Sequence, residues 1–408
     1  MPARRQWFAW HSLFGLQCSI LLSFVLVTGT LATVSLEIDW LATPQMRHHG
    51  EVVRDYDWGG MLDSARAAYP QAEILSLDAP AAPWVNAEVI ARSEDNPRFR
   101  IFVDPATAKV RGIGRWNNWR RFFRQIHRHL NLPVAWGVSI VGLLSLPLLV
   151  SLVSSFYIYR RWWAGFFRLP PRGAHGKSTA VKVQRVEWGY WHRLLGVWSL
   201  WFLLLMGVTG IWYLAEQWGL RASYPPLPAA SETFVATPGG AELNDLLAQV
   251  EQEWPEFRTK QIVFELSEPG MTKIQGQYQA WLVRPRANAV VFDNASGEAV
   301  QQRVGTQLNV HHRISEAADP LHFGTFGGFW TRLIWFLFGA ALSALAVSGV
   351  YLFGLRAISA ARASRDTQPR TSWTQGWLAM QRGSRWSQVL VVTVGMGLAG
   401  YYFLIYVP

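Results

Sequence analysis

The sequence predicts an α-helical membrane protein built from a duplicated unit of helix, outer domain and helix. Half of the 408 residues are hydrophobic and only 16% are charged, whereas about a quarter are charged in a typical soluble protein. Five apolar runs reach the length of about 20 residues with which a helix crosses the hydrocarbon core. Two parts of the chain also repeat the same motifs at one spacing. We therefore expect a membrane bundle with two domains outside the bilayer.

The apolar runs give the number of spans. Many of the 23 Trp lie at their ends, as expected for indole rings at the headgroup level. The first run follows Arg4 and Arg5. It is too long for a signal-peptide core and has no clear cleavage site, so we expect an uncleaved anchor. The runs are Ser12–Leu36, Leu132–Tyr159, Leu194–Ala215, Phe329–Phe353 and Gln388–Val407.

The basic residues predict the topology. Arg160 to Arg193 holds eight Lys or Arg against one acid, and Arg356 to Arg385 holds six against one. Short basic loops stay in the cytoplasm, so the net charge of +11 indicates topology rather than a nucleic-acid partner. The expected segments are TM1 (1–36), outer domain 1 (37–128), TM2 (129–159), a cytoplasmic loop (160–190), TM3 (191–215), outer domain 2 (216–328), TM4 (329–355), a cytoplasmic loop (356–385) and TM5 (386–408).

The two outer segments are predicted to be small α+β domains. Each begins with a helix that ends at a proline, Pro70 or Pro255, and continues as strands with a polar turn. The expected turns are Asp104-Pro105-Ala106-Thr107 and Asp293-Asn294-Ala295-Ser296-Gly297. The expected helices are Trp58–Tyr69 and Ala241–Trp254. The expected strands are Trp84–Arg92, Arg98–Val103, Gln261–Leu266, Lys273–Gln277, Gln279–Val283 and Ala289–Phe292.

Three matched features support a duplication. His11, Gly15 and Gly29 recur as His192, Gly196 and Gly210, and 192 − 11, 196 − 15 and 210 − 29 all equal 181. A constant offset over three features, combined with a repeated outer domain, indicates that one unit was copied. Sites in membrane repeats often form where the copies meet, so the polar residues present in both copies are the candidates.

Those polar residues are histidines. His11 and His192 lie at the cytoplasmic ends of TM1 and TM3, while His127 or His129 precedes TM2 and His322 precedes TM4. Two neutral imidazoles saturate the axial positions of a b-type haem iron. Two haems, one at each face, would give an electron path across the membrane. The alternative is that each histidine is an interfacial residue without a ligand role.

Each of the other candidate residues has two possible roles. Gly15 and Gly196 lie on the helical face of their histidines, where they either admit a macrocycle or allow close helix packing. Arg124, in a cluster with Arg120, Arg121 and Arg128, either pairs with haem propionates or belongs to an amphipathic surface helix. His311 and His312 are either substrate-side ligands or solvated loop residues.

Several cofactor classes are not predicted. The lone Cys18 allows no cysteine-based metal or redox site within the chain. There is no GxGxxG after a strand and no P-loop, so we expect no nucleotide or flavin domain. Electrons would have to come from a separate donor.

The chain resembles the PepSY-associated transmembrane family over nearly its whole length, most specifically in the Leu-His-Phe-Gly stretch ending at Gly324. The outer segments look like PepSY domains. The resemblance implies a bacterial inner-membrane protein with a four-helix core that binds two haem b groups, plus a fifth helix. It also favours His127 over His129 as the outer ligand. The matching segments are Trp10-His11…Gly15, Trp191-His192…Gly196, His127-Arg128-x-Leu130 and Asp319-x-Leu321-His322-Phe323-Gly324.

The family includes dihaem reductases of ferric siderophores, similar to ferrioxamine reductase. The resemblance therefore implies an oxidoreductase that receives electrons from a cytoplasmic or quinol donor and reduces periplasmic ferric chelates. The alternative is a non-enzymatic membrane sensor or protease regulator, whose helices only anchor the PepSY-like domains. A transporter is disfavoured, because the spans carry almost no charged residue at mid-depth.

Overall fold

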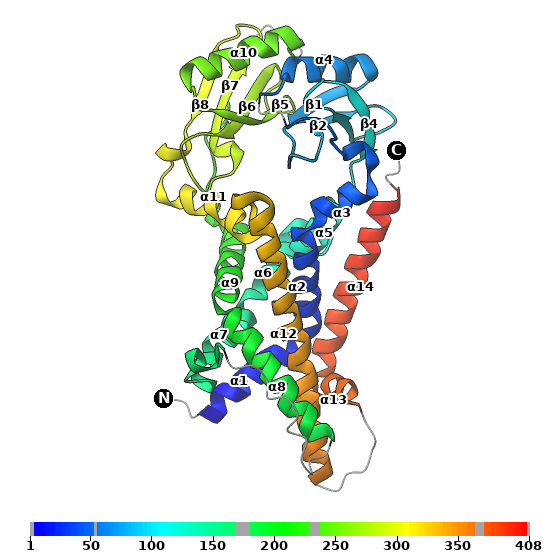
Figure 1. Ribbon diagram of the computed structural model, residues 1–408, viewed down its shortest axis with the longest axis vertical. Coiled ribbons are helices and arrows are strands. Elements are labelled where there is room, and N and C mark those ends of the chain that lie inside the picture. The colour runs from blue at the N-terminus through cyan, green and yellow to red at the C-terminus, as the bar shows by residue number, and fades with distance from the viewer. Residues whose placement is uncertain (1–3, 53–54, 168–179, 229–236, 364–370, 406–408) are drawn as a thin grey trace. The chain divides into compact units, whose positions relative to one another are not determined.

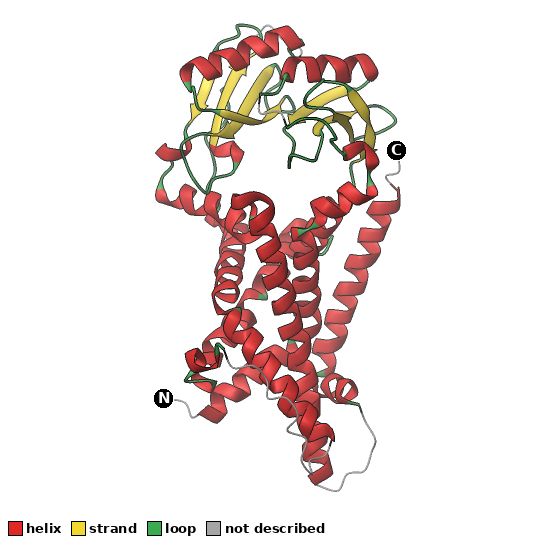
Figure 2. Cartoon of the chain, viewed as in Figure 1, coloured by secondary structure: helices red, strands yellow, loops and turns green. Residues whose placement is uncertain are grey.

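The computed structural model describes residues 4–52, 55–167, 180–228, 237–363 and 371–405. The chain divides into two compact units. The helical unit contains residues 1–34, 122–220 and 330–401, and the sheet unit contains residues 35–121, 221–329 and 402–408. Every described strand belongs to the sheet unit (Figure 2). Parts of the predicted cytoplasmic loops, residues 168–179 and 364–370, lie outside the described residues.

Apolar helices build the helical unit. Four helical segments are long and apolar enough to cross a membrane, and α1 with α2 makes a fifth if the bent pair counts as one span. These segments follow the five predicted apolar runs. The helices (Figure 1) are α1 (Arg4–Gln17), α2 (Ser19–Thr33), α5 (Trp119–His129), α6 (Val134–Leu143), α7 (Ser145–Ile158), α8 (Ala180–Trp198), α9 (Leu200–Ala215), α12 (Gly328–Ala363), α13 (Ser372–Ala379) and α14 (Arg382–Ile405).

The first span is not the single helix that the sequence predicted. Helices α1 and α2 meet at an angle of 70°. The break falls at Cys18, whose φ and ψ are −104° and 5°. The second copy breaks between α8 and α9 at Ser199, with φ and ψ of −93° and 4°. Since 199 − 18 is again 181, the break belongs to the repeated unit.

The sheet unit contains one antiparallel sheet of eight strands. Its order is β4-β3-β2-β1-β5-β6-β7-β8, so the two predicted domains are joined edge to edge, with Leu77 of β1 opposite Ile262 of β5. The strands are β1 (Glu73–Asp78), β2 (Ala87–Arg92), β3 (Phe99–Val103), β4 (Val110–Arg115), β5 (Arg258–Val263), β6 (Met271–Gln277), β7 (Asn288–Asp293) and β8 (Ala299–Arg303).

Two helices cover one face of this sheet. Helices α4 (Trp58–Ala68) and α10 (Gly240–Glu253) confirm the predicted helices, and their apolar sides share one core with the strands of both copies. The Gly59 N–H donates to Asn244 at 3.0 Å, and the Gly240 N–H donates to Asp63 at 3.0 Å. Because 240 − 59 and 244 − 63 both equal 181, these reciprocal bonds show that the duplication persists in the tertiary structure.

Some strand predictions were wrong. No strand forms at Gln279–Val283, since Gln279 and Leu282 have φ angles of +49° and +55°, and left-handed residues do not continue a strand. Strands β1, β4 and β8 were missed. The polar turns are confirmed: Asp104 and Asp293 each accept hydrogen bonds from backbone N–H groups two residues on, at 2.9 and 2.7 Å. Such Asx turns close β-hairpins.

Further helices of the sheet unit include α3 (Ser35–Ala42), the 3₁₀ turn η1 (Pro44–Met46) and α11 (Val310–Phe323). Asp39 of α3 accepts hydrogen bonds from the N–H groups of Trp119 and Arg120 at 2.7 and 3.0 Å, and so caps the start of α5.

Candidate cofactor site

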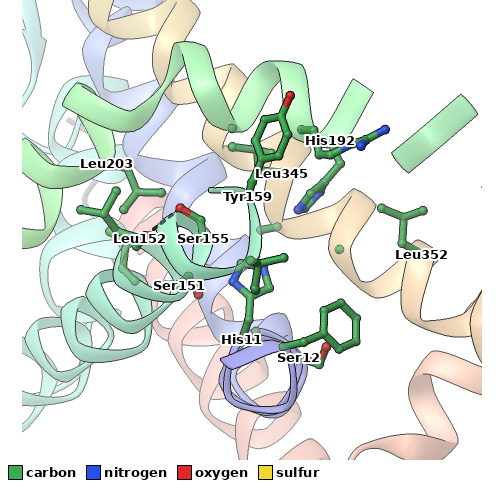
Figure 3. Close-up of a pocket in the computed structure, with 18 of the residues that line it drawn as sticks. His11, Ser12, Ser151, Leu152, Ser155, Tyr159, His192, Leu203, Leu345 and Leu352 are labelled. Atoms are coloured by element: carbon green, nitrogen blue, oxygen red, sulfur yellow. Dashed lines mark hydrogen bonds between the residues drawn. The ribbon is translucent and has the colours of Figure 1, made fainter. Parts of the chain in front are cut away.

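A cavity of about 390 Å³ lies inside the helical unit. Its volume falls in the range of about 300–1,000 Å³ that is usual for cofactor sites. Helices α1, α7, α8 and α12 supply most of the wall, and most lining side chains are apolar. Both His11, from α1, and His192, from α8, line it (Figure 3). The two copies of the repeat therefore each contribute one histidine to one cavity.

A serine fixes the tautomer of His11. The Nδ1 atom of His11 lies 3.0 Å from the Ser154 hydroxyl of α7, which donates its own proton to the Ser151 carbonyl at 3.1 Å. A hydroxyl has one proton to donate, so Ser154 accepts from Nδ1–H. The neutral imidazole then carries its lone pair on Nε2.

The same arrangement recurs at His192. Its Nδ1 lies 2.8 Å from the Ser348 hydroxyl of α12, and Ser348 donates to the Leu345 carbonyl at 3.2 Å. In its neutral form His192 therefore also carries the proton on Nδ1, which leaves Nε2 as the nitrogen that can bind a metal. A second bond that fixes the ring and its tautomer is typical of histidines that ligate metal ions.

The glycines beside these histidines face open space. A Cβ atom added to Gly15 would meet nothing within 4 Å, and one added to Gly196 would only touch Leu345 at 3.9 Å. Both glycines line the cavity. The alternative that they allow close helix packing is wrong for these two positions. It holds elsewhere: a Cβ on Gly207 would lie 2.5 Å from Leu149.

Three arginines also line the cavity. They are Arg4 of α1, Arg193 of α8 and Arg356 of α12. Arg356 lies over the ring of Phe8 at 4.5 Å, and Arg193 over that of Tyr190 at 4.5 Å. Guanidinium groups at the rim of an apolar cavity are suited to carboxylates such as haem propionates. Arg124, the arginine that the sequence predicts for this role, is instead an exposed residue of α5.

The histidines of α5 differ in their surroundings. His127 donates Nδ1–H to the Val25 carbonyl of α2 at 2.9 Å. Its ring packs against Gly29, where an added Cβ would lie only 2.6 Å from the ring atom Cε1. The duplicated Gly29 thus makes room for this imidazole. His129 donates instead to the Leu132 carbonyl just after its own helix, at 3.0 Å. His127 is therefore held by a second helix, whereas His129 closes the end of α5.

The remaining candidates lie on α11 in the sheet unit. His322 is in the last turn of α11, and its ring contacts Phe323 edge-on at 5.4 Å. His312 is half-buried, and its Nε2 lies 3.0 Å from the Ser223 carbonyl. The rings of His311 and His312 are 6.3 Å apart. Among the described residues, no group of three or more His, Cys, Asp or Glu could hold a metal ion. The pairing of His127 with His322 stays a prediction.

A buried carboxylate ties the start of α5 to the sheet. Glu88 of β2 is 5% exposed and pairs with Arg100 and, at 3.0 Å, with Arg120 of α5. Burial alone would raise the pKa of Glu88, but the two guanidinium groups outweigh it and hold the pKa below its usual value. Glu88 is therefore ionised at neutral pH.

Helix α11 has an equivalent attachment with the charges reversed. Here the helix supplies the carboxylate, Glu316, which is 1% exposed. It accepts hydrogen bonds from Arg284, Arg286 and Tyr224 at 2.8 to 3.0 Å. Burial would raise the pKa of Glu316, and its arginine partners lower it below the usual value. Burial and the nearby Glu316 together raise the pKa of Tyr224 to about 12.

The residues around the cavity fit a six-coordinate haem. Two imidazoles from opposite copies with Nε2 available, apolar walls, two glycines with space beside them and nearby arginines are what such a group requires. Four residues at this cavity were not predicted from the sequence: Ser154, Ser348, Arg193 and Arg356. The available signal was weak: a serine in each of TM2 and TM4 about seven helical turns beyond the histidine that precedes the span.

The fold and the cavity define an integral membrane protein made from a duplicated helix pair around an internal site. The chain belongs to the family of the PepSY-associated TM region, which matches residues 8–356. That range includes both copies of the repeat, both cavity histidines and α11. No protein among curated sequences matches the chain.

Proposed function

We propose that the chain is a haem-dependent electron-transfer protein of a bacterial inner membrane. The observation that carries this is the matched pair His11–Ser154 and His192–Ser348 on one cavity. Haem b held by two imidazoles supplies one-electron redox chemistry and has no open position for a substrate. The chain's own part is to hold both imidazoles neutral, to exclude water with apolar walls, and to neutralise carboxylates at the rim.

A second haem is proposed between His127 and His322. The support is that each of these histidines lies on the helix that precedes an apolar span, one in each copy, and that the Val25 carbonyl accepts Nδ1–H of His127, which leaves Nε2 of the neutral ring for a metal. Two haems would connect the two faces of the membrane. A cytoplasmic or quinol donor would then supply the electrons, and the N-terminus would lie in the cytoplasm.

The substrate is proposed from the family resemblance. A ferric siderophore or another ferric chelate would be reduced on the periplasmic side of the membrane. Iron would then be released, because ferrous ion binds hydroxamates weakly. This makes the protein a ferric-chelate reductase. A membrane sensor or protease regulator without cofactor is the alternative, and it predicts no chromophore.

The deciding experiment is the reduced-minus-oxidised absorbance spectrum of the purified protein in detergent. We expect a b-type haem band, and we expect His192→Ala to remove about half of it. His312→Ala is the matched control, because His312 is a half-buried histidine whose partner, the Ser223 carbonyl, lies in its own unit. Absence of the band in the wild type would leave the sensor alternative. With the band present, pre-reduced protein should be reoxidised by a ferric siderophore.

A further inference from the structure

A glutamine of the last helix is inserted into the first span. Gln388 of α14 is 8% exposed. Its Oε1 accepts a hydrogen bond from the Leu21 N–H at 2.9 Å, and its Nε2 donates to the Gln17 carbonyl at 2.6 Å. In an uninterrupted α-helix the Leu21 N–H would donate to that same carbonyl, four residues earlier. The carboxamide of Gln388 therefore replaces one backbone bond of the helix.

This insertion supports the bend at Cys18. Sharp kinks have few causes: proline, Gly/Ser pairs, a π-bulge, or a side chain inserted into the backbone hydrogen bonds. Residues 4–33 contain no proline. The two groups that Gln388 bonds, at Gln17 and Leu21, are on either side of Cys18, where α1 and α2 meet at 70°. Figure 1 shows α14, in red, running along the helical unit.

Neighbouring groups add further hydrogen bonds around Gln17, and we call this set of bonds, together with those of Gln388, the clasp. Ser384 also donates to the Gln17 carbonyl, at 2.7 Å. The Gln17 side chain accepts from the Gln381 N–H at 2.9 Å and donates to the Ala379 carbonyl at 3.4 Å. An unsatisfied backbone group costs several kcal/mol in an apolar surrounding, so these bonds stabilise the break. Both α13 and α14 contribute to it.

The second copy has the same break without this clasp. The backbone bonds of the break residue itself are alike in both copies: the Cys18 N–H donates to Phe14 at 3.4 Å and the Ser199 N–H to Leu195 at 3.0 Å, while Cys18 and Ser199 accept from Leu22 and Leu203 at 2.9 and 2.8 Å. The copies differ in the side chains around the break. Within the described part of the chain, no side chain from another helix bonds the backbone there. The appended helix α14 therefore acts on copy one alone.

We propose that Gln388 is a positioning residue, which holds the bend at Cys18 and so directs α1, with His11, toward the cavity. The bend lays α1 against α7, where Trp7 stacks on Tyr157 with ring centroids 4.1 Å apart and His11 meets Ser154. The consequence for an iron ligand rests on the proposed function. The bend itself does not depend on it.

A distance measurement tests the bend. Spin labels would be placed at two exposed positions, Trp10→Cys on α1 and Val27→Cys on α2, in a Cys18→Ser background that copies Ser199 of the second copy. At 1.5 Å per residue these positions are about 25 Å apart in a straight helix and about 21 Å apart with the bend. We expect Gln388→Leu to lengthen the distance toward the larger value. An unchanged distance would overturn the proposal.

Gln381→Leu is the matched control, because it makes the same chemical change on an exposed side chain beside α14 and keeps the backbone N–H that bonds Gln17. It should leave the distance as in the wild type. In haem-loaded protein, Gln388→Leu should also alter the low-spin electron paramagnetic resonance signal of the inner site alone. A longer distance with an unaltered signal would refute the positioning of His11. If the wild type bound no haem, the proposed function would be refuted. The spin-label distance alone would then test the role of Gln388.

Discussion

The two copies of the repeat agree around the cavity and differ around α5 and α11. In both, a histidine of the first helix donates Nδ1–H to a serine of the second, which donates to a carbonyl three residues earlier. Both breaks and both cavity glycines also correspond at the offset of 181. Identical geometry in both copies is expected where a symmetrical group must be bound from two sides.

The attachments of α5 and α11 do not need to be identical, and they are not. Copy one places the carboxylate, Glu88, on the sheet and the arginine, Arg120, on the helix. Copy two places the arginines before the helix and the carboxylate, Glu316, on it. Each arrangement holds its helix to the sheet, so either polarity serves. The comparison indicates that the two copies stay alike around the cavity, where the site depends on matched groups. They differ at the attachments of α5 and α11, where either placement of the charges holds the helix.

The largest effect should follow from filling the cavity. Gly15→Phe or Gly196→Phe places a ring in space where an added Cβ meets nothing closer than 3.9 Å. We expect either variant to fold with an unchanged thermal midpoint and to lose the inner haem, measured by the b-type absorbance per protein. Gly207→Ala is the contrast, because its Cβ would lie 2.5 Å from Leu149. That overlap should cost about 1–3 kcal/mol of stability. Full haem content in Gly15→Phe would contradict the assigned site.

Removing either serine should weaken haem binding in both copies alike. Ser154→Ala and Ser348→Ala each delete the acceptor of one Nδ1–H, and loss of such a partner typically lowers metal affinity about 10–100-fold. Haem titration of the apoprotein measures this. Ser155→Ala is the control, since Ser155 also lines the cavity but bonds only Leu152. Unequal losses of haem affinity in the two variants would show that the two copies contribute differently to binding in spite of their matched geometry.

The two buried carboxylates should differ in their contribution to stability. Glu88→Gln leaves Arg100 with its side chain 5% exposed and without its counter-charge, which typically costs about 3–5 kcal/mol. Glu316→Gln should cost less, about 1–3 kcal/mol by the same comparison, because the side chains of Arg284 and Arg286 are 22% and 41% exposed and Arg284 keeps Asp319. Urea unfolding in detergent micelles measures both. The reverse order would refute this account of the two attachments.

The smallest effect concerns the junction of the two half-sheets. Burial and the nearby Glu88 raise the pKa of Asp78 to about 6, although its side chain accepts a hydrogen bond from Gln261 across the β1–β5 junction. A raised folded-state pKa means that protonation favours the fold, so stability should fall as pH rises from about 4 to about 6. Asp78→Asn should remove that slope and stabilise the protein at pH 7 by an amount on the order of 2 kcal/mol. Unfolding midpoints from pH 4 to 8 measure it, and an unchanged slope in the variant would contradict the assignment to Asp78.

Much of the architecture could be predicted from the sequence. The apolar runs, the offset of 181, the helices before Pro70 and Pro255, and the turns at Asp104 and Asp293 all have local signals: hydrophobic length, repeated motifs and turn residues. The missed strands β1, β4 and β8 have weak local signals, and pairing with neighbours decides them. The false strand at Gln279–Val283 has strand-forming residues, but Gln279 and Leu282 are left-handed.

The sequence by itself determined the duplication, the spans and the two histidines that line one cavity, because composition and spacing are properties of the chain. Only the tertiary structure decided that the outer halves form one sheet, that Gly15 and Gly196 face open space, and that serines fix the tautomers of His11 and His192. It also revealed Gln388 at the bend of the first span, where the sequence gives α14 no evident role. These contacts join residues up to 371 positions apart, and no local pattern encodes which partners meet when helices pack.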